Sequence, residues 1–495
     1  MNSSRANREY DAIVVGSGAG GGAAAYRLAR AGCDVLLLEK GEVLPTDGST
    51  LDTARVVTNG EFLSREPWRD AAGNELRPEE HFNVGGKTRW YGAALLRYAP
   101  HEFAADAAHG CRAWPIAYRD LEPYYLEAER LLGVREFERE PSLSRIVARL
   151  ARSGGWRAEP LPMGLAPDIV EDAHEAAHFD GFASARGLKA DAQSAFLERA
   201  GGANRLTTLA GAPVASLLHA PGNVGRVAGV RTTDGREFRA RATLLAAGAL
   251  HSPRLLQQYV DQHALAARLP AARNVGRNLK LHLLTAMVSV GGRLQSDLLR
   301  KTTLILNERF PHSSVQPLGF DAELMARLIP AGVPRPLARQ VAARAYGFFL
   351  QTEDGAHADN RVLAPHGDDP RPTLDYCAAR LPAAEREHRA VTRAFTLSLL
   401  RCGFMSFTQR IGLNGTAHAQ GTLSAGDDPA TSVVDARGRV HGLESLYVVD
   451  GSVLPRSGRA NPSLTIYAWA LRVADLLAPG LRRVTGSTAR MTEPA

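Results

Sequence analysis

The chain has 495 residues, of which 45% are hydrophobic and 22% charged, proportions typical of a globular protein and not of a disordered or fibrous one. The formal net charge of +7 makes nucleic acid a partner to consider, but the basic residues are scattered and no basic run is typical of a phosphate-binding surface. The four cysteines are far apart and form no C-x-x-C pair, so neither a zinc site nor a dithiol centre is predicted and no metal is expected.

The ends of the chain carry no targeting signal that we recognise. The first ten residues have no apolar core, and no stretch approaches the ~18 to 20 apolar residues that a membrane span requires. We therefore expect a cytoplasmic protein with no integral membrane span and no nucleic-acid partner. The small and polar residues 486–495 are expected to form a disordered tail.

Residues 10–39 read as strand, tight turn, helix and strand, with Gly16, Gly18 and Gly21 in a G-x-G-x-x-G pattern at the turn. The first glycine permits the turn, the second lets the backbone approach a pyrophosphate, and the third lets the helix pack closely on the sheet. Free N–H groups at the helix start, at Ala19, would hold the phosphates. Glu39, followed by Lys40, would accept hydrogen bonds from the adenosine ribose. These residues alone leave FAD and NAD open.

The middle and end of the chain contain further elements. Between residues 205 and 248, Asp234 and Gly235 are predicted to form the turn of a β-hairpin, and the run ends in the buried strand ATLLAAG. Residues 294–409 contain amphipathic helical stretches, including AELMARLIPAG and AAEREHRAVTRAFTLSLLRCG. Residues 418–477 return to short strands and one helix. A nucleotide-binding domain assembled from separated segments is therefore predicted.

Three further segments resemble the signature regions of glucose-methanol-choline oxidoreductases. They are NVGGKTRWYGAALLRY at 83–98, LLAAGALHSPRLL at 244–256, and the stretch 418–477, which begins HAQGT and contains YVVDGS and NPSLTIYAW. Together with the glycine turn they follow the family's order along nearly the whole chain. Four ordered matches are far more specific than any one of them.

This resemblance implies an α/β (α+β overall) fold with a discontinuous Rossmann-like FAD-binding domain and a mixed sheet-plus-helices substrate domain. We assign 1–100, 201–293 and 410–485 to the FAD-binding domain, and 101–200 and 294–409 to the substrate-binding domain and cap. The resemblance also implies cofactor contacts at Gly85, Gly86, Val214, Ala247, Gly248, Asp450, Gly451, Asn461, Pro462 and Thr465. Because the segment after Gly86 has no histidine, we predict noncovalent FAD.

The resemblance further implies a catalytic pair, His418 in H-x-x-G-T and Asn461 before the last helix. Oxidising an alcohol removes a proton from oxygen and a hydride from carbon, so one group must accept the proton near neutral pH. His418 suits that role, and the amide of Asn461 can donate to the substrate oxygen without competing for the proton. His441 is expected in a turn, and His251 and His282 are expected to be structural.

Several alternatives stay open. The chain has Leu423-Ser424-Ala425-Gly426 where relatives often have Cys-Arg-Met-Gly, which puts the local geometry in doubt. A lyase that keeps FAD without redox use is the main alternative function. The substrate is expected to be a small-molecule alcohol. The segments that follow Trp90 resemble those of sugar and aminoglycoside dehydrogenases of the family, which favours a sugar, polyol or glycoside. Oxygen, a quinone and a cytochrome all remain candidate electron acceptors.

Overall fold

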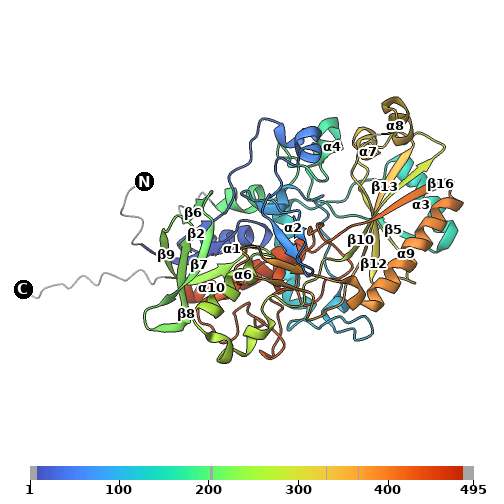
Figure 1. Cartoon of the computed structure of the whole chain (residues 1–495). Helices are drawn as coiled ribbons and strands as arrows, with labels where there is room; N and C mark the ends of the chain where they lie inside the picture. The colour runs from blue at the N-terminus through green and yellow to red at the C-terminus, as the bar shows by residue number, and fades with distance from the viewer. Residues whose placement is uncertain (1–7, 201–204, 330–331, 366, 483–495) are drawn as a thin grey trace, which may run out of the picture.

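The computed structural model describes residues 8–200, 205–329, 332–365 and 367–482. Two β-sheets, one of seven strands and one of six, form the two lobes seen at the left and right of Figure 1. The predicted tail at 486–495 lies outside the described residues.

The seven-stranded sheet begins with the βαβ unit that the sequence predicts. β1 (Glu9–Val15) and β2 (Val35–Leu38) pair in parallel, and α1 (Ala19–Arg30) connects them. Every residue of β1 after Glu9, and all of β2, is buried, as expected for parallel strands covered on both faces. The small residues of α1 let it pack closely against α10 (Ser463–Leu481).

The rest of this sheet comes from distant parts of the chain. β9 (Glu237–Leu245) pairs in parallel with β1, and the short β17 (Leu446–Val448) pairs in parallel with β9. The predicted hairpin is confirmed, because β8 and β9 pair antiparallel and Gly235 has a φ of +85° at their turn. The remaining strands are β6 (Leu206–Leu209), β7 (Val214–Ala220) and β8 (Asn223–Thr232).

The parallel strands of this sheet end at one common edge. β1, β2, β9 and β17 are followed there by Gly16, Glu39, Ala246 and Val449. In open α/β sheets, ligands bind outside the carboxyl ends of such strands. Segments more than 400 residues apart in sequence, at Gly16 and Val449, therefore meet at a single candidate site.

The second sheet is antiparallel throughout, with the order β16-β10-β13-β12-β11-β5. Helices α3 (Pro141–Gly154) and α9 (Pro382–Arg401) cover its outer face, at the far right of Figure 1. Because side chains alternate along a strand, Phe348 packs into this outer core whereas Phe349 lines a cavity on the other face. The strands are β5 (Arg157–Pro160), β10 (Leu283–Gly291), β11 (Thr303–Leu306), β12 (Ser313–Pro317), β13 (Ala345–Thr352) and β16 (Phe404–Arg410).

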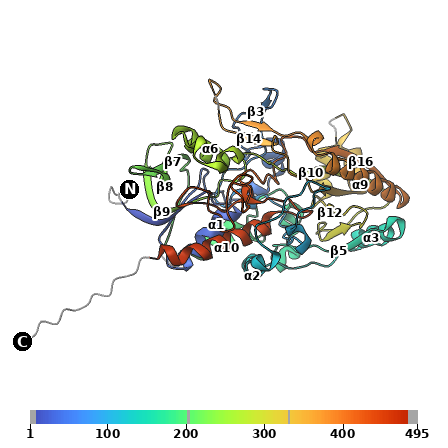
Figure 2. The same cartoon turned by 90° about the horizontal axis from the view of Figure 1, so that it is seen from below.

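Smaller elements complete the molecule. A four-stranded sheet, seen edge-on with β3 and β14 at the top of Figure 2, consists of β3 (Trp68–Asp70), β4 (Glu75–Leu76), β14 (Arg361–Leu363) and β15 (Thr373–Asp375). The two predicted amphipathic helices are confirmed as α7 and α9. α7 spans Ala322–Leu328, and the other α-helices in the described part of the chain are α2 (Tyr118–Leu132), α4 (Ala173–His178), α5 (Glu198–Ala200), α6 (Ser252–Gln262) and α8 (Arg335–Ala342).

Two elements depart from the predicted domain limits. β10 lies within the 201–293 segment assigned to the FAD-binding domain, but its hydrogen bonds to β13 and β16 make it part of the second sheet. α2 lies within the 101–200 segment assigned to the substrate domain, but Leu121 and Tyr125 bury its apolar face in the core of the first lobe, where α2 packs against α10.

Among the described helices, α10 is long and apolar enough to cross a membrane, with a mean hydropathy of 1.2 over its best window. This corrects the prediction that no stretch approaches that length and character. In the structure, 61% of the window is buried, and α10 packs against α1 and α2 in the core of the first lobe. Such burial is typical of a core helix.

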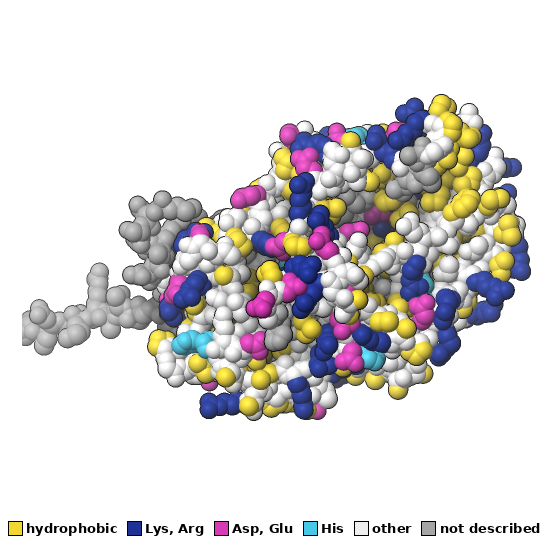
Figure 3. Space-filling model, in the orientation of Figure 1, with side chains coloured by type: hydrophobic (Ala, Val, Ile, Leu, Met, Phe, Trp, Pro, Cys, Tyr) yellow, Lys and Arg dark blue, Asp and Glu magenta, His cyan; other side chains and the backbone are white. Residues whose placement is uncertain are grey.

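The surface agrees with the expectation drawn from charge. On the face seen in Figure 3, Lys and Arg side chains are dispersed among acidic ones and form no single basic patch. Hydrophobic side chains gather at the upper right of that view, over the region of α7 and α8.

Candidate active site

A cavity of about 1190 Å³ lies at the carboxyl edge of the first sheet and reaches the inner face of the second. Most of the predicted site residues line it. They are Gly16, Gly18, Ala19, Glu39, Lys40, Gly86, Val214, Ala247, Gly248, His418, Asp450, Gly451, Asn461 and Pro462. Their roles toward a cofactor stay predictions, but the fold brings them to one place.

The glycine turn forms one end of the cavity, and each position is occupied by glycine for a different physical reason. Gly16 has a φ of +101°, and a Cβ there would lie 2.4 Å from the Ala246 carbonyl oxygen. Gly21 does not line the cavity, because it packs against the turn, where a Cβ would lie 1.9 Å from the Gly16 oxygen. A Cβ on Gly18 would meet no protein atom within 4 Å, so the space beside it is free for a ligand.

Glu39 holds the shape of this turn. One carboxylate oxygen accepts hydrogen bonds from the Ser17 N–H at 3.0 Å and the Ser17 hydroxyl at 2.6 Å, and the other accepts from the Gly41 N–H at 3.0 Å. Burial raises the pKa of Glu39, and these hydrogen bonds oppose the shift. The predicted contact with a ribose would add to these protein contacts.

The loop at Gly85 and Gly86 closes on the same turn. A Cβ on Gly86 would lie 3.0 Å from the Gly18 Cα, so only glycine allows this approach without displacement. Gly85 does not line the cavity: its φ is +88° and its N–H donates to the Ser17 hydroxyl at 3.0 Å. Gly85 therefore shapes the loop, and its contact with the cofactor stays a prediction.

Asp450 is held by the protein on all sides. One oxygen accepts from the Gly248 N–H at 2.8 Å and the Ser252 hydroxyl at 2.5 Å, and the other accepts from Ser452. Burial raises the pKa of Asp450. The carboxylate thus ties the loop after β17 to the loop after β9.

Thr465 differs from the prediction. It is fully buried, does not line the cavity, and its hydroxyl lies 2.8 Å from the Tyr125 hydroxyl on α2. The preceding residues Asn461, Pro462 and Ser463 do line the cavity, so the positive end of the α10 dipole faces it. Thr465 lies on the other side of that helix, in the contact between α10 and α2.

His418 and Asn461 meet in the cavity, with 3.4 Å between the His418 Nε2 and the Asn461 Nδ2. The pKa of His418 lies well below its ordinary value, because it is buried and because His282, Lys301 and Lys87 repel a positive charge. The direction of this shift favours the neutral imidazole, in which one ring nitrogen is an acceptor.

Two histidines that were expected to be structural belong to the surroundings of this site. His282 lies 3.2 Å from His418, measured between their Nδ1 atoms. His251 lines the cavity, with its Nε2 3.7 Å from Glu80. His441 lies in a turn as expected, with its Nε2 2.9 Å from the Gly426 carbonyl oxygen, and does not line the cavity.

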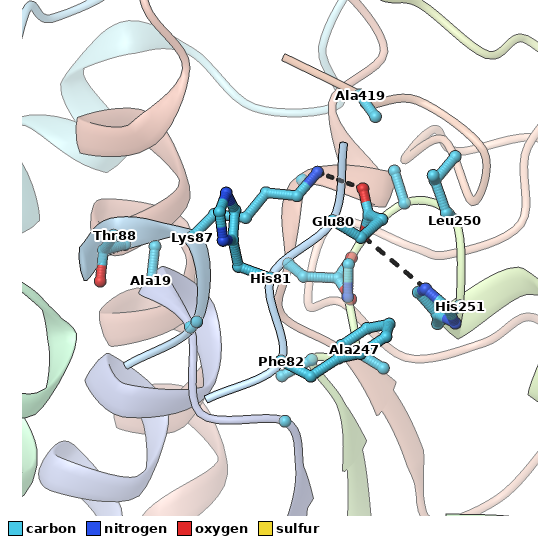
Figure 4. A pocket seen from close by; sticks show the side chains of 18 of the residues that line it. Ala19, Glu80, His81, Phe82, Lys87, Thr88, Ala247, Leu250, His251 and Ala419 are labelled. Carbon is cyan, nitrogen blue, oxygen red and sulfur yellow. Dashed lines mark hydrogen bonds and ion pairs between the residues drawn. The ribbon is translucent and has the colours of Figure 1, made fainter. Parts of the chain in front are cut away.

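Glu80 is the centre of a polar cluster that sequence analysis missed. Figure 4 shows it between Lys87 and His251, in the wall of the cavity. Burial alone would raise its pKa, but Lys87 and His251 lower the pKa of Glu80 to about 2. The Lys87 ammonium also donates to the Thr416 carbonyl at 2.9 Å, which joins this cluster to the segment that carries His418.

The cavity reaches the second sheet at a second charged pair. The Lys301 ammonium lies 3.0 and 3.1 Å from the two Asp180 oxygens, and one of these also accepts the Gly319 N–H at 2.9 Å. Leu318, Phe320 and Phe349 line the same end. This end therefore combines apolar walls with a few fixed polar groups, as small-molecule sites commonly do.

Two overlapping groups of side chains outside the cavity have the geometry to approach a metal ion: His109, His312 and Glu387, and Cys111, His312 and Glu353. Their atoms already have protein partners. His312 Nδ1 lies 2.9 Å from Glu353, and His109 Nε2 lies 2.7 Å from the Glu353 carbonyl oxygen. We assign no metal to them.

The glycine turn and His418 line one cavity, the arrangement that the family resemblance implies. Comparison with known proteins agrees. Models of the GMC oxidoreductase match residues 82–284 and 378–470, and a model of an NAD(P)-binding Rossmann-like domain matches 14–57. The chain is 31% identical to 6'''-hydroxyparomomycin C oxidase of Streptomyces lividus and 30% identical to paromamine 6'-oxidase of Streptomyces fradiae, covering 96% of this chain and 92% of each relative.

Solved structures share the fold. Pyridoxine 4-oxidase from Mesorbium loti superposes with a TM-score of 0.69 at 21% identity, over 94% of this chain and 99% of that one. Formate oxidase from Aspergillus oryzae superposes with a TM-score of 0.72 at 14% identity, over 95% of this chain and 98% of that one. The chain belongs to the GMC oxidoreductase family. Its cofactor is FAD, which fits the open space beside Gly18 in a cavity that both this turn and His418 line.

Proposed function

We propose that this protein oxidises a primary or secondary alcohol, on a sugar, polyol or glycoside, to the carbonyl, with His418 as the general base. The observation that carries the proposal is the position of the His418 imidazole, 3.4 Å from the Asn461 amide, in the cavity that also holds the dinucleotide turn.

The chain's own residues supply the proton chemistry. His418 Nε2 accepts the hydroxyl proton, and the Asn461 Nδ2 donates to the oxygen on which negative charge develops. FAD, when bound, supplies the acceptor for the hydride that leaves the carbinol carbon.

The substrate class is supported from two sides. The relatives at 30% and 31% identity are named as oxidases of paromamine and 6'''-hydroxyparomomycin C. The substrate end of the cavity carries Lys301, Asp180 and Gln316 between apolar side chains, groups able to hydrogen-bond hydroxyls. FAD is proposed to be held without a covalent bond, and acid precipitation of the protein should release it.

Anaerobic mixing tests the reaction. The purified yellow protein is mixed with a panel of sugars, polyols, glycosides and simple alcohols, and bleaching of the flavin absorbance is followed. Bleaching identifies the substrate class, and its return in air or only with a quinone or cytochrome identifies the acceptor. A flavin that no alcohol bleaches would contradict the proposal and favour the lyase alternative.

A variant tests the base. His418→Ala should bind FAD as the wild type does and slow flavin reduction at least on the order of a hundredfold, the usual scale for a positioned base. The matched control is His441→Ala, because His441 lies in a turn outside the cavity. Reduction of the His418→Ala flavin at the control rate would end the assignment.

A further inference from the structure

His282 occupies an unusual place behind the catalytic pair. It is 3% exposed and has a φ of +60°, a backbone conformation that non-glycine residues rarely adopt. Its two ring nitrogens face different partners: Nε2 lies 2.8 Å from the Gly458 carbonyl oxygen and Nδ1 lies 3.2 Å from His418 Nδ1. The ring thus bridges a backbone carbonyl and the proposed base.

The Gly458 carbonyl determines the direction of these hydrogen bonds. A carbonyl oxygen only accepts, so the proton of a neutral His282 must be on Nε2 and its Nδ1 must be an acceptor. His418 Nδ1 must then carry a proton in order to donate to His282 Nδ1. The remaining His418 nitrogen, Nε2, then carries a lone pair and acts as an acceptor.

The hydrogen bonds at the Nε2 side of His418 indicate the same tautomer. The Gln316 Nε2 donates to the Asn461 Oδ1 at 2.6 Å, so the Asn461 Nδ2 faces the His418 Nε2 as a donor. A proton on His418 Nε2 would place two donors against each other. Hydrogen bonds traced from both ends therefore agree on one tautomer.

The Gly458 carbonyl is held firmly in place. The Gly458 N–H donates to Glu353 at 2.9 Å, and Glu353 is paired with the buried Arg456. The next residue is fixed as well, because the Arg459 carbonyl accepts from Ser314 at 2.8 Å and from Gln351 at 2.6 Å. The acceptor that sets the direction of the chain of hydrogen bonds thus belongs to a rigid loop.

We propose that His282 is a positioning residue that keeps His418 in the Nδ1–H tautomer, with the Nε2 lone pair directed into the cavity to take the proton of the substrate hydroxyl. This inference rests on the proposed function of His418. In the reaction, that proton moves to Nε2 while His418 Nδ1–H keeps donating to His282, so the imidazolium stays oriented for return of the proton to solvent.

The tautomer can be read without substrate. Protein labelled with ¹⁵N-histidine and loaded with FAD is studied by NMR, and His418→Ala identifies the His418 signals by their loss. We expect a protonated Nδ1 and a bare Nε2 in the wild-type protein. A His418 with the proton on Nε2 would overturn the proposal, whatever the rate of flavin reduction in His418→Ala.

Two variants separate positioning from mere packing. His282→Asn keeps an acceptor for His418 and tolerates a positive φ, so the tautomer and the rate of flavin reduction should stay close to wild type. His282→Leu removes the acceptor, so both tautomers should appear and kcat should fall on the order of 10- to 100-fold with little change in KM. The pH profile of reduction should change in the Leu variant alone.

The outcomes are distinct. Equal tautomer populations and equal pH profiles in the Asn and Leu variants would refute the positioning role. If the Leu variant does not bind FAD, the wild-type and Asn spectra still decide the case. A normal tautomer combined with an unaffected His418→Ala would instead refute the proposed function of His418.

Discussion

Replacing Glu353 with Gln should destabilise the protein by about 3–5 kcal/mol, the range seen when one partner of a buried ion pair is removed. Arg456 binds this carboxylate with two hydrogen bonds, of 2.6 and 2.9 Å, and the two side chains are only 3% and 1% exposed. In Glu353→Gln the guanidinium stays buried without its counter-charge, and one of its donors meets the amide NH₂.

The matched control is Glu237→Gln on the surface. Glu237 pairs with Arg231 at the hairpin of β8 and β9, where the side chains are 37% and 51% exposed. Exposed pairs contribute about 0.2–1 kcal/mol, so this variant should unfold nearly as the wild type does. Urea unfolding of the FAD-loaded proteins, followed by tryptophan fluorescence, gives the difference from the shift in midpoint.

The effect should also depend on pH. Burial alone would raise the pKa of Glu353, but hydrogen bonds and charge from His312 and Arg456 place it below its ordinary value. A lowered pKa means that the carboxylate stabilises the protein fully above about pH 4.3, its ordinary pKa, and loses this contribution as the pH falls further. The difference in the free energy of unfolding between wild type and Glu353→Gln should therefore become smaller below about pH 4. At pH 7, a loss of unfolding free energy in Glu353→Gln no larger than that in Glu237→Gln would refute the reasoning.

The remaining predictions concern the cofactor site. Gly18→Ala should fold as the wild type does, because the added Cβ meets no protein atom within 4 Å. It should bind FAD at least about tenfold more weakly, because this Cβ would occupy the space that we expect the pyrophosphate to fill. Gly21→Ala should lower both FAD affinity and the melting temperature, because its Cβ would lie 1.9 Å from the Gly16 oxygen. Thr465→Val should leave FAD affinity unchanged and lower the free energy of unfolding by about 1–3 kcal/mol, since it removes one hydrogen-bond partner of the buried Tyr125 hydroxyl.

These variants are compared by flavin fluorescence titration and by melting with and without FAD. Wild-type FAD affinity in Gly18→Ala would place the pyrophosphate elsewhere. A Gly21→Ala protein as stable as wild type would mean that the turn relaxes without cost. Loss of FAD from Thr465→Val would support the direct cofactor contact that the family resemblance implies for Thr465.

Local patterns in the sequence were enough to predict the first lobe. The β1-α1-β2 unit and the Asp234–Gly235 hairpin follow from short-range periodicity and turn chemistry, and both are confirmed. The meeting of His418 and Asn461 was inferred from the family resemblance, since nothing in their spacing brings them together. The choice of cofactor likewise needed the whole chain.

Other parts of the site arise from long-range pairing that no local pattern encodes. His282 and His418 are 136 positions apart, and Lys301 and Asp180 are 121 apart. They meet only because β10 and the loop before β11 enter the second sheet beside the end of the first. His282 precedes an apolar strand, which is typical of a structural residue, so its sequence context pointed away from the site. Thr465 shows the converse, because a family motif extends past the residues that line the cavity.

The order in which the chain leaves the ribosome has a consequence for flavin loading. β9 is flanked by β1, made early, and by β17, made late, and Asp450 follows β17 at the floor of the nucleotide site. A nascent chain can form the glycine turn, but it cannot enclose a flavin until α10 has been synthesised. We therefore expect cofactor capture to be a late step of folding, and a chain that stalls before residue 446 to leave one side of β9 unpaired along 243–245 and open to aggregation.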